Sequence, residues 1–324
     1  MFFSVFISYT LWMSYPITFR QLEIFNSVAT HSSYTRASEE LHLSQPAVSM
    51  QIKQMENLID CALTEKIGKK LYLTDVGKVM WEYSINVLSC KAAMEETLAS
   101  MQGTEKGHLR LAVPETANQF VTLLLAEFRK FHPGISFELQ ILNRKGLLES
   151  LKDNSSDLVI MGQTPSDMEL NIKPFMNNPL VIIAPAKHAL SNKKKIQLSD
   201  LTEVEFVVRE VGSGTRIAMR KFFSENGIRL NTAMEMPNNE AIKQAVAAGL
   251  GFGIVSLHTL QQELALKQVK VLKVKELPIM RVWYVVHQKQ KVLTPAMEIF
   301  ESFVIEKTQR VWLEKYPELA SHLK

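Results

Sequence analysis

Residues 34–53 hold two short helical patterns joined by a tight turn, and no other segment of this 324-residue chain limits its fold as strongly. Ser44 can cap the second helix through its hydroxyl, and Pro46 suits a first turn whose backbone amides have no partner inside the helix. The second helix is therefore predicted to begin at Gln45. The apolar positions recur at helical spacing and are expected to face a core: Ala37, Leu41, Val48, Ile52, Met55 and Ile59. This pattern is typical of a helix-turn-helix.

Off the apolar stripe, the second helix carries Gln45, Ser49 and Lys53 at every fourth residue. Gln pairs with adenine edges, Ser bonds to either kind of base, and Lys reaches phosphate or guanine. The spacing fits a helix that reads DNA, and it fits an ordinary amphipathic surface helix equally well. The residues expected to contact DNA are Tyr34, Arg36, Ser44, Gln45, Pro46, Ser49, Gln51 and Lys53.

Four motifs in the N-terminal part of the chain decide between these alternatives. They are Phe19-Arg20-Gln21-Leu22-Glu23-Ile24-Phe25, Ala37-Ser38-Glu39-Glu40-Leu41, Leu43-Ser44-Gln45-Pro46-Ala47-Val48-Ser49 and Leu73-Thr74-Asp75-Val76-Gly77. Together they resemble the DNA-binding domain of LysR-type transcriptional regulators. The resemblance implies an all-α winged helix-turn-helix over residues 18–75, with Leu22, Phe25 and Val28 packing the first helix onto the other two. It also implies a wing over residues 66–73.

The predicted wing departs from this family at its base. Family members usually carry a Gly and then Leu-Phe before a basic residue, whereas this chain has Asp60-Cys61-Ala62-Leu63-Thr64-Glu65. Thr64 thus replaces a buried aromatic side chain. The packing of the wing and its phosphate contacts therefore do not follow from the resemblance.

Charge alone does not mark this domain as DNA-binding. Residues 19–72 carry six basic and six acidic side chains, although the whole chain has a net charge of +4 and a pI near 8.9. Attraction to DNA must therefore come from the local placement of basic residues. The candidates are Arg36, Lys53, Lys66, Lys69 and Lys70, of which the last three fit a solvated turn equally well.

Length and composition allow two or three folding units, since 46% of the residues are hydrophobic. Cys61 and Cys90 form neither a disulfide framework nor a metal-binding spacing, which fits a cytoplasmic protein without a metal site. Residues 1–17 begin with an apolar run that lacks a basic leader and is too broken and short to span a membrane. We expect a disordered or non-native extension, or translation from Met13, and no membrane partner.

A new period begins after the wing, where apolar residues follow a narrow, heptad-like stripe. The stripe consists of Val76, Met80, Tyr83, Val87, Cys90, Met94, Leu98 and Met101. So narrow a seam favours a partner helix, and packing against the chain's own C-terminal region is the alternative. In LysR-type proteins the equivalent linker helix and hinge, residues 76–106 here, pair subunits into a homodimer or homotetramer. Cys90 is expected to be buried on this seam, with a redox switch as the alternative.

From residue 107 on, short apolar strands alternate with helical patterns, which favours an α/β architecture with parallel sheets. The predicted strands are Leu109–Val113, Phe137–Leu142, Asp157–Met161, Leu180–Ala184, Phe206–Val208, Gly253–Val255, Val271–Val274 and Arg281–Val286. The region resembles the effector domain of LysR-type regulators, which has two Rossmann-like lobes of the periplasmic-binding-protein type II fold. The resemblance places lobe I at residues 107–180 and 284–315, and lobe II at residues 181–283.

Three loops at predicted strand ends have the chemistry to bind an anionic ligand between the lobes. They are Pro114–Asn118, Gly212–Arg216 and Asn238–Glu240. In the second loop, two glycines and two hydroxyls precede a helix whose positive end faces the loop. The loop lacks the ending of a Walker motif, and capping of the following helix is the alternative for each of the three. The expected effector-binding residues are Glu115, Thr116, Asn118, Gln163, Ser213, Gly214, Thr215, Arg216, Glu240 and Ser256.

Several stretches of this region point to a narrower group. They are Leu109–Asn118, Asp157–Gln163, Gly212–Arg216, Glu240–Gly251 and Ile254–His258. They resemble CbbR, the LysR-type activators of Calvin-cycle (RuBisCO) operons. The resemblance implies an activator that works with RNA polymerase on double-stranded promoter DNA. It also implies a small anionic effector, either a phosphorylated sugar or acid or NADPH, and no other cofactor. Regulation of inorganic-carbon uptake, or of nitrogen or sulfur assimilation, is the alternative.

Two other classes of protein fit the sequence less well. An enzyme would need a nucleophile with a base or paired carboxylates, and the eight histidines are scattered without such a motif. We therefore expect no catalytic residues. A solute-binding protein would need export, which a DNA-reading helix argues against.

Overall fold

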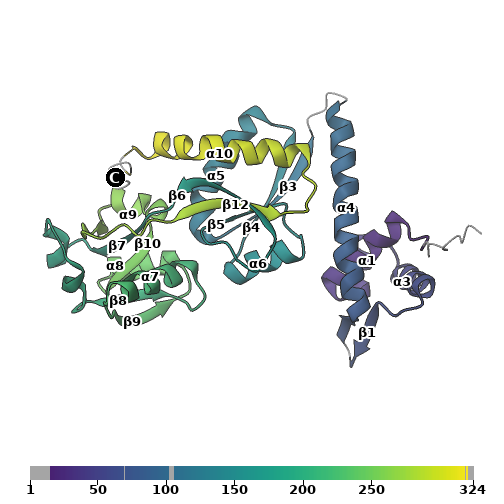
Figure 1. Ribbon diagram of the computed structural model, residues 1–324, viewed down its shortest axis with the longest axis horizontal. Helices are drawn as coiled ribbons and strands as arrows, with labels where there is room; N and C mark the ends of the chain where they lie inside the picture. Colours follow the sequence, from purple (N-terminus) through teal and green to yellow (C-terminus); the bar gives the residue numbers. More distant parts are fainter. Residues whose placement is uncertain (1–14, 69, 102–105, 318, 320–324) are drawn as a thin grey trace, which may run out of the picture. The chain divides into compact units, whose positions relative to one another are not determined.

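The computed structural model describes residues 15–68, 70–101, 106–317 and 319 (Figure 1). The chain forms two compact units, with the boundary between Ala92 and Ala93. Most of the predicted N-terminal extension and of the predicted hinge after residue 101 lies outside the described residues, as does Lys69. Each unit is described by itself below.

Unit 1 is a helix-turn-helix followed by a two-stranded wing and a long helix. Its elements are α1 (Phe19–His31), α2 (Tyr34–Glu40), α3 (Gln45–Ile59), β1 (Thr64–Ile67), β2 (Lys70–Leu73) and the part of α4 (Asp75–Met101) that precedes the unit boundary. The Ser44 hydroxyl accepts a hydrogen bond from the Ala47 amide at 3.3 Å, which confirms the predicted start of α3. Buried side chains of the three helices and of Leu63, which precedes β1, form one core: Leu22, Phe25, Val28, Ala37, Val48, Ile52, Met55 and Leu63.

Helix α4 begins in the core of unit 1 and then exposes an apolar stripe. Met80 packs against that core, and Trp81 Nε1 donates to Asn26 Oδ1 of α1 at 2.9 Å. Cys90 is exposed within this single chain, and its burial on a seam with a partner helix stays a prediction. The exposed apolar side chains of the stripe are Val76, Tyr83, Val87, Met94, Leu98 and Met101, and Val79 outside the stripe is also exposed.

Lobe I of unit 2 is built on a five-stranded sheet in the order β4-β3-β5-β12-β6. Helices α5 and α10 pack on one face of the sheet and α6 packs on the other (Figure 1). Its elements are β3 (Gly107–Val113), α5 (Glu115–Phe131), β4 (Ile135–Ile141), α6 (Arg144–Lys152), β5 (Leu158–Met161), β6 (Leu170–Asn177), β12 (Val282–Gln288) and α10 (Pro295–Lys315).

Lobe II contains a second five-stranded sheet, in the order β11-β7-β10-β8-β9, with α7 and α8 packed on it. Its strands and helices are β7 (Leu180–Pro185), η1 (Ala189–Asn192), η2 (Leu198–Leu201), β8 (Glu205–Arg209), α7 (Gly214–Glu225), β9 (Asn231–Met236), α8 (Asn239–Ala247), β10 (Phe252–Ser256), η3 (Leu257–Thr259), α9 (Gln261–Ala265) and β11 (Val269–Val271). Buried residues of α8 and of the central strands belong to the same core cluster as α5 and α10, so one core cluster spans both lobes, and each lobe has a further cluster of its own.

The predicted α/β lobes are confirmed, but the sheets are mixed and not wholly parallel. Strand β12 runs antiparallel to β5 and β6, and β7 runs antiparallel to β10 and β11. The chain crosses between the lobes twice, and the two crossings pair with each other. The Asn178 amide donates to the Arg281 carbonyl at 2.7 Å, and the Arg281 amide donates to the Asn178 carbonyl at 3.2 Å.

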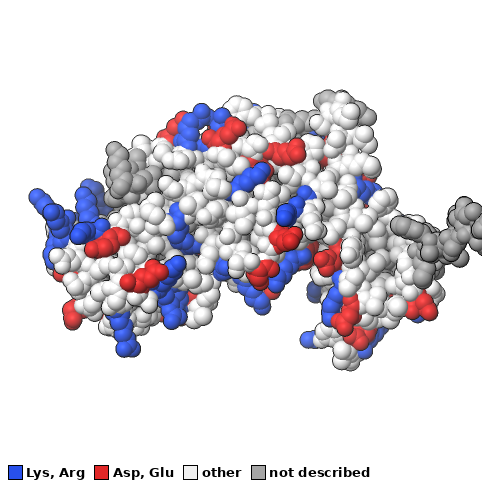
Figure 2. Space-filling model, viewed as in Figure 1, with Lys and Arg blue, Asp and Glu red and all other residues white. Residues whose placement is uncertain are grey.

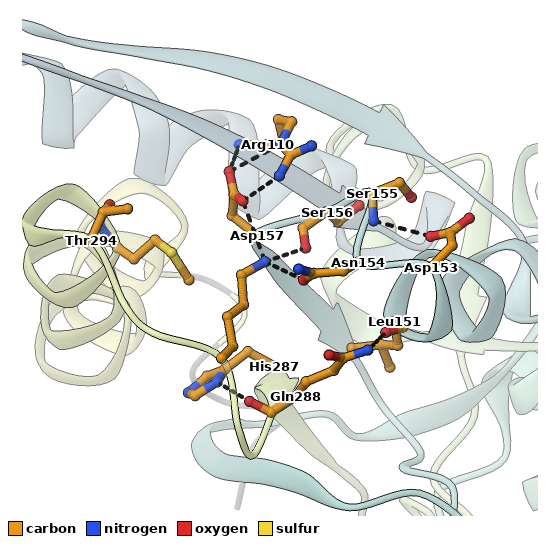
Figure 3. Close-up of polar contacts among 12 residues, drawn as sticks. Arg110, Leu151, Asp153, Asn154, Ser155, Ser156, Asp157, His287, Gln288 and Thr294 are labelled. Atoms are coloured by element: carbon orange, nitrogen blue, oxygen red, sulfur yellow. Dashed lines mark hydrogen bonds and ion pairs between the residues drawn. The ribbon is translucent and has the colours of Figure 1, made fainter. Parts of the chain in front are cut away.

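A buried polar network closes lobe I at the amino end of β5 (Figure 3). Asp157 accepts from Arg110 Nη2 at 2.8 Å, and the Lys291 ammonium donates to Asn154 Oδ1 at 2.7 Å and to the Ser156 carbonyl at 2.8 Å. Burial lowers the pKa of Lys291 to about 8, although the Asp157 carboxylate partly offsets this effect. The network connects the turn after β12 to the residues that precede β5. The carboxyl end of β5 is not part of this network.

Candidate functional site

The face of α3 that points away from the core carries the residues predicted to read DNA. Gln45, Pro46 and Lys53 are exposed, and Ser49 and Gln51 are half-buried. Gln45, Pro46, Ser49 and Lys53 line one shallow surface depression together with Met50, Gln54 and Asn57. This surface is presented by one helix, as insertion into a DNA groove requires, and five of its seven side chains are polar or charged.

The base of the wing is fixed by hydrogen bonds from the two preceding helices. Tyr34 of α2 bonds through its hydroxyl to Thr64 Oγ1 at 2.8 Å. Glu56 of α3 accepts from the amides of Leu63 and Thr64 at 2.9 and 3.3 Å. Burial raises the pKa of the Tyr34 phenol. These contacts explain why Thr64 can stand at the base of the wing in place of an aromatic residue. The Leu63 side chain packs in the core, and the Thr64 hydroxyl is the hydrogen-bond partner of Tyr34.

The second site is a cleft of about 450 Å³ between the two lobes of unit 2. Loops at the carboxyl ends of β3, β5, β8 and β10 supply much of its lining, as the positions of the predicted loops require. The predicted effector-binding residues that line it are Glu115, Thr116, Gln163, Ser213, Gly214, Thr215 and Ser256.

Three predicted effector-binding residues lie elsewhere. Asn118 and Glu240 line a different depression, where Glu240 pairs with Lys243 at 2.8 Å. Arg216 donates to the carbonyl of Arg209 at 2.7 Å and pairs with Glu235, so its guanidinium is not directed at the Gly212 loop. The prediction that Arg216 presents its donors to an anion in that loop is wrong for this structure.

Three arginines that the sequence did not single out line the cleft. Arg209 is neutralised by Glu210, which accepts from its Nε and Nη2 at 2.7 and 2.9 Å. Arg144 donates to the carbonyl of Gln163 at 2.7 Å, and Arg281 donates to the carbonyl of Gly162 at 2.6 Å. Two of them could have been predicted from their positions in sequence, because Arg209 is the last residue of β8 and Arg144 is the first residue of the helix after β4. Arg281 stands in the second crossing and gave no such signal.

Arg281 is the cation best placed to hold an anion. Burial, and repulsion from Arg144, lower its pKa to about 10, and no carboxylate within the described chain forms an ion pair with it. Its guanidinium faces the start of α7, because a Cβ added to Gly214 would lie 3.5 Å from Nη2. Ser213 makes no side-chain capping bond to α7, so the first amides of that helix also face outward without a cap.

The chemistry of this corner of the cleft is therefore that of an anion site. Backbone amides at a helix start, the hydroxyls of Ser213 and Thr215, and one guanidinium converge on the same space. A phosphate can accept bonds from all three kinds of donor. The described residues contain no cluster of three metal-ligating side chains, and no helix among them is long and apolar enough to cross a membrane.

One carboxylate bridges the two lobes at the rim of the cleft. Glu115, the first residue of α5 in lobe I, accepts from the Asn239 amide at the start of α8 in lobe II at 3.1 Å. Arg209 Nη1 lies 3.7 Å from the same carboxylate oxygen and donates to Asn239 Oδ1 at 2.9 Å. The Glu115 carboxylate thus places a negative charge at the N-terminus of α8.

Comparison with protein families assigns both units. The family described as bacterial regulatory helix-turn-helix protein, lysR family, matches residues 19–78, and the LysR substrate binding domain matches residues 102–309. The chain is 46% identical to the RuBisCO operon transcriptional regulator of Allochromatium vinosum over 91% of this chain and 98% of that protein. It is 44% identical to the HTH-type transcriptional activator CmpR of Synechocystis sp. over 91% of this chain and 97% of that protein.

A solved structure matches the effector region. The CcmR regulatory domain of Synechocystis PCC6803, in complex with 2-PG, superposes with a TM-score of 0.61 and 38% identity. The match covers 63% of this chain and 98% of that domain. Together the comparisons confirm the predicted order of a winged helix-turn-helix followed by a ligand-binding domain.

Proposed function

This chain belongs to the LysR family of bacterial transcriptional regulators, and we propose that it controls carbon-fixation genes in response to a phosphorylated metabolite. The anion site around Arg281 is the observation that supports the effector class. The unneutralised guanidinium and the start of α7 supply charge and donors for a phosphate, while polar groups such as Asn178 and Gln163 line the rest of the cleft. A phosphorylated sugar or acid, or NADPH, has the matching chemistry.

The target genes are inferred from relatives. The similarity to a RuBisCO operon regulator over nearly the whole of both proteins supports a Calvin-cycle operon as the target. A second candidate is the control of inorganic-carbon uptake, because the identity to CmpR is almost as high. The gene beside this one on the chromosome distinguishes the two candidates.

Pairing of subunits through α4 is the proposed basis of operator recognition. The exposed stripe along α4 includes Tyr83, which is 66% exposed, and Met101, which is 80% exposed. Large apolar side chains in a row on one helix favour burial against a second copy. A homodimer or homotetramer would present its α3 helices in pairs to a dyad-symmetric promoter site in the cytoplasm, beside RNA polymerase.

Footprinting of the purified protein on the adjacent promoter tests this function. We expect protection of a dyad-symmetric site, and a change in its extent when 2-phosphoglycolate, ribulose 1,5-bisphosphate or NADPH is added. The effector-site variant is Thr215→Val, and Thr232→Val on the exposed strand β9 is its control. Thr215→Val should abolish the response and leave protection intact, because the reading helices are untouched. Protection that no phosphorylated metabolite alters, in either the parent protein or the control, would refute the effector class.

A further inference from the structure

Eight exposed lysines lie in two short stretches of lobe II, residues 187–195 and 267–275, which contain no acidic residue. We call this surface the lysine band. It consists of Lys187, Lys193, Lys194, Lys195, Lys267, Lys270, Lys273 and Lys275. Figure 2 shows Lys and Arg side chains gathered over lobe II, at the left of the view. The band lies away from the cleft, since none of its members lines it.

Hydrogen bonds hold the two stretches side by side. The Ile196 amide donates to the Lys273 carbonyl at 3.2 Å, and the Lys275 amide donates to the Ile196 carbonyl at 3.3 Å. Lys270 Nζ also donates to Asn192 Oδ1 at 2.8 Å. A depression of about 540 Å³ lies where the stretches meet. Five members of the band line it: Lys193, Lys194, Lys267, Lys270 and Lys273.

Little of this positive charge is neutralised. Lys193 pairs with Asp200 at 2.8 Å. For Lys194, Lys267 and Lys273, no carboxylate of the described residues lies within the 4.0 Å of an ion pair. Adjacent ammonium groups without counter-charges create a positive potential that attracts polyanions. The band is therefore a candidate surface for a repeated negative charge.

The composition of the band favours a phosphate backbone over a protein partner. Neither stretch contains Arg, Trp, Tyr or Phe, whereas protein interfaces are enriched in these residues and depleted in lysine. Lysine on an edge strand also prevents edge-to-edge pairing, but only Lys270 lies within β11. Flexible stems that carry point charges suit phosphates spaced along a duplex.

We propose that the lysine band binds the sugar-phosphate backbone of double-stranded DNA that flanks the operator. The proposal rests on the DNA binding proposed above and adds a contact outside the reading helix. Residues 19–72 carry as many acidic as basic side chains, so the reading domain has little net attraction for DNA. The band supplies the sequence-independent attraction that this domain lacks.

The salt dependence of DNA binding by the full-length protein tests the proposal. The band variant carries Lys194→Gln, Lys267→Gln and Lys273→Gln. A control variant removes the same charge from exposed lysines on helices outside the band, where each lysine pairs with a neighbouring carboxylate. Its substitutions are Lys130→Gln, Lys145→Gln and Lys221→Gln. Binding to a minimal operator and to the same operator with long flanks is measured between about 50 and 200 mM salt.

Each phosphate that a lysine neutralises contributes about 0.9 to the slope of log affinity against log salt concentration. Removing three such lysines should therefore reduce the slope on the long fragment by about 2.7 for each subunit whose band contacts the DNA, and for one such subunit the drop in affinity over this fourfold salt range becomes about 40-fold smaller. The minimal operator and the control variant should show the parental slope.

A parental slope of the band variant on the long fragment would overturn the proposal. If that result were accompanied by a failure of promoter activation, an acidic protein partner would be indicated in its place. Failure of the parent protein to bind the operator at all would instead refute the proposed function, so the two failures are distinguishable.

Discussion

Replacing Arg281 should make the protein more stable while it abolishes binding of an anionic effector. Burial lowers the pKa of Arg281 to about 10 in the folded chain, more than two units below the pKa of an ordinary arginine. Each pKa unit corresponds to about 1.4 kcal/mol, so holding this charge without an anion costs the folded state about 3 kcal/mol. Because the folded-state pKa of a basic group is lowered, this cost is fully present below pH 10 and falls only as the pH rises through that value.

The variant Arg281→Gln removes the charge and keeps an amide that can donate to the Gly162 carbonyl. A weakened hydrogen bond there offsets about 1 kcal/mol. The net gain of about 2 kcal/mol raises the midpoint of thermal unfolding by about 4–8 °C for a domain of this size. Arg220→Gln, on the exposed face of α7, is the matched control and should leave the midpoint unchanged.

Thermal unfolding at pH 7 in a phosphate-free buffer measures both effects. Addition of 2-phosphoglycolate at about a hundred times its dissociation constant should stabilise the parent protein by about 2.7 kcal/mol and leave Arg281→Gln unmoved. A lower midpoint for Arg281→Gln without ligand would refute the assignment of Arg281 as an unneutralised charge. A ligand shift that survives the substitution would place the anion elsewhere in the molecule.

Three further predictions concern unit 1. Ser49→Ala should weaken operator binding by about tenfold and binding to unrelated DNA much less, and equal losses in gel-shift assays would remove Ser49 from base readout. Tyr34→Phe should lower the free energy of unfolding in urea by about 1 kcal/mol because it deletes the hydrogen bond to Thr64. Combining Thr64→Val with Tyr34→Phe should cause little further loss of this free energy, and additive losses would show that the two hydroxyls act independently. Gly77→Ala should cost at least about 2 kcal/mol in the same assay because the added Cβ would lie 2.0 Å from the carbonyl oxygen of Leu63, and an unchanged midpoint would contradict that close approach.

Local sequence determined the elements whose patterns are local. The Ser44 cap, Pro46 and the apolar stripe of α3 lie within one short segment, so the helix start was predictable. Strand β9 (Asn231–Met236) was missed because it is an edge strand with mostly exposed side chains and therefore no apolar run. Strand β6 (Leu170–Asn177) was missed because Pro174 and alternating exposure interrupt its pattern. The antiparallel direction of β12 depends on a chain reversal that no local pattern encodes.

The residues of the cleft likewise divide into those that a local sequence pattern predicts and those that depend on distant parts of the chain. Ser213 and Thr215 belong to one glycine-containing loop and were recognisable from residue types alone. Arg281 reaches the start of α7 only because the second crossing pairs with Asn178 across the lobes. Arg216 has the residue type and the position in sequence expected of an anion-binding residue, but its guanidinium forms an ion pair with Glu235 of β9. The availability of an arginine to a ligand therefore depends on its counter-charge, which is adjacent in sequence for Arg209 and distant in sequence for Arg216.

The charged groups at the cleft rim explain how a ligand can act on lobe geometry. Glu115 places a carboxylate at the start of α8 and near Arg209, and so holds lobe I against lobe II. A phosphate bound between Arg281 and α7 would add a second link at another corner of the cleft, made entirely of donors. A ligand changes an equilibrium only by its differential affinity for the two states. Because Arg281 lies in the crossing itself, a phosphate held by its guanidinium would link that segment to the start of α7.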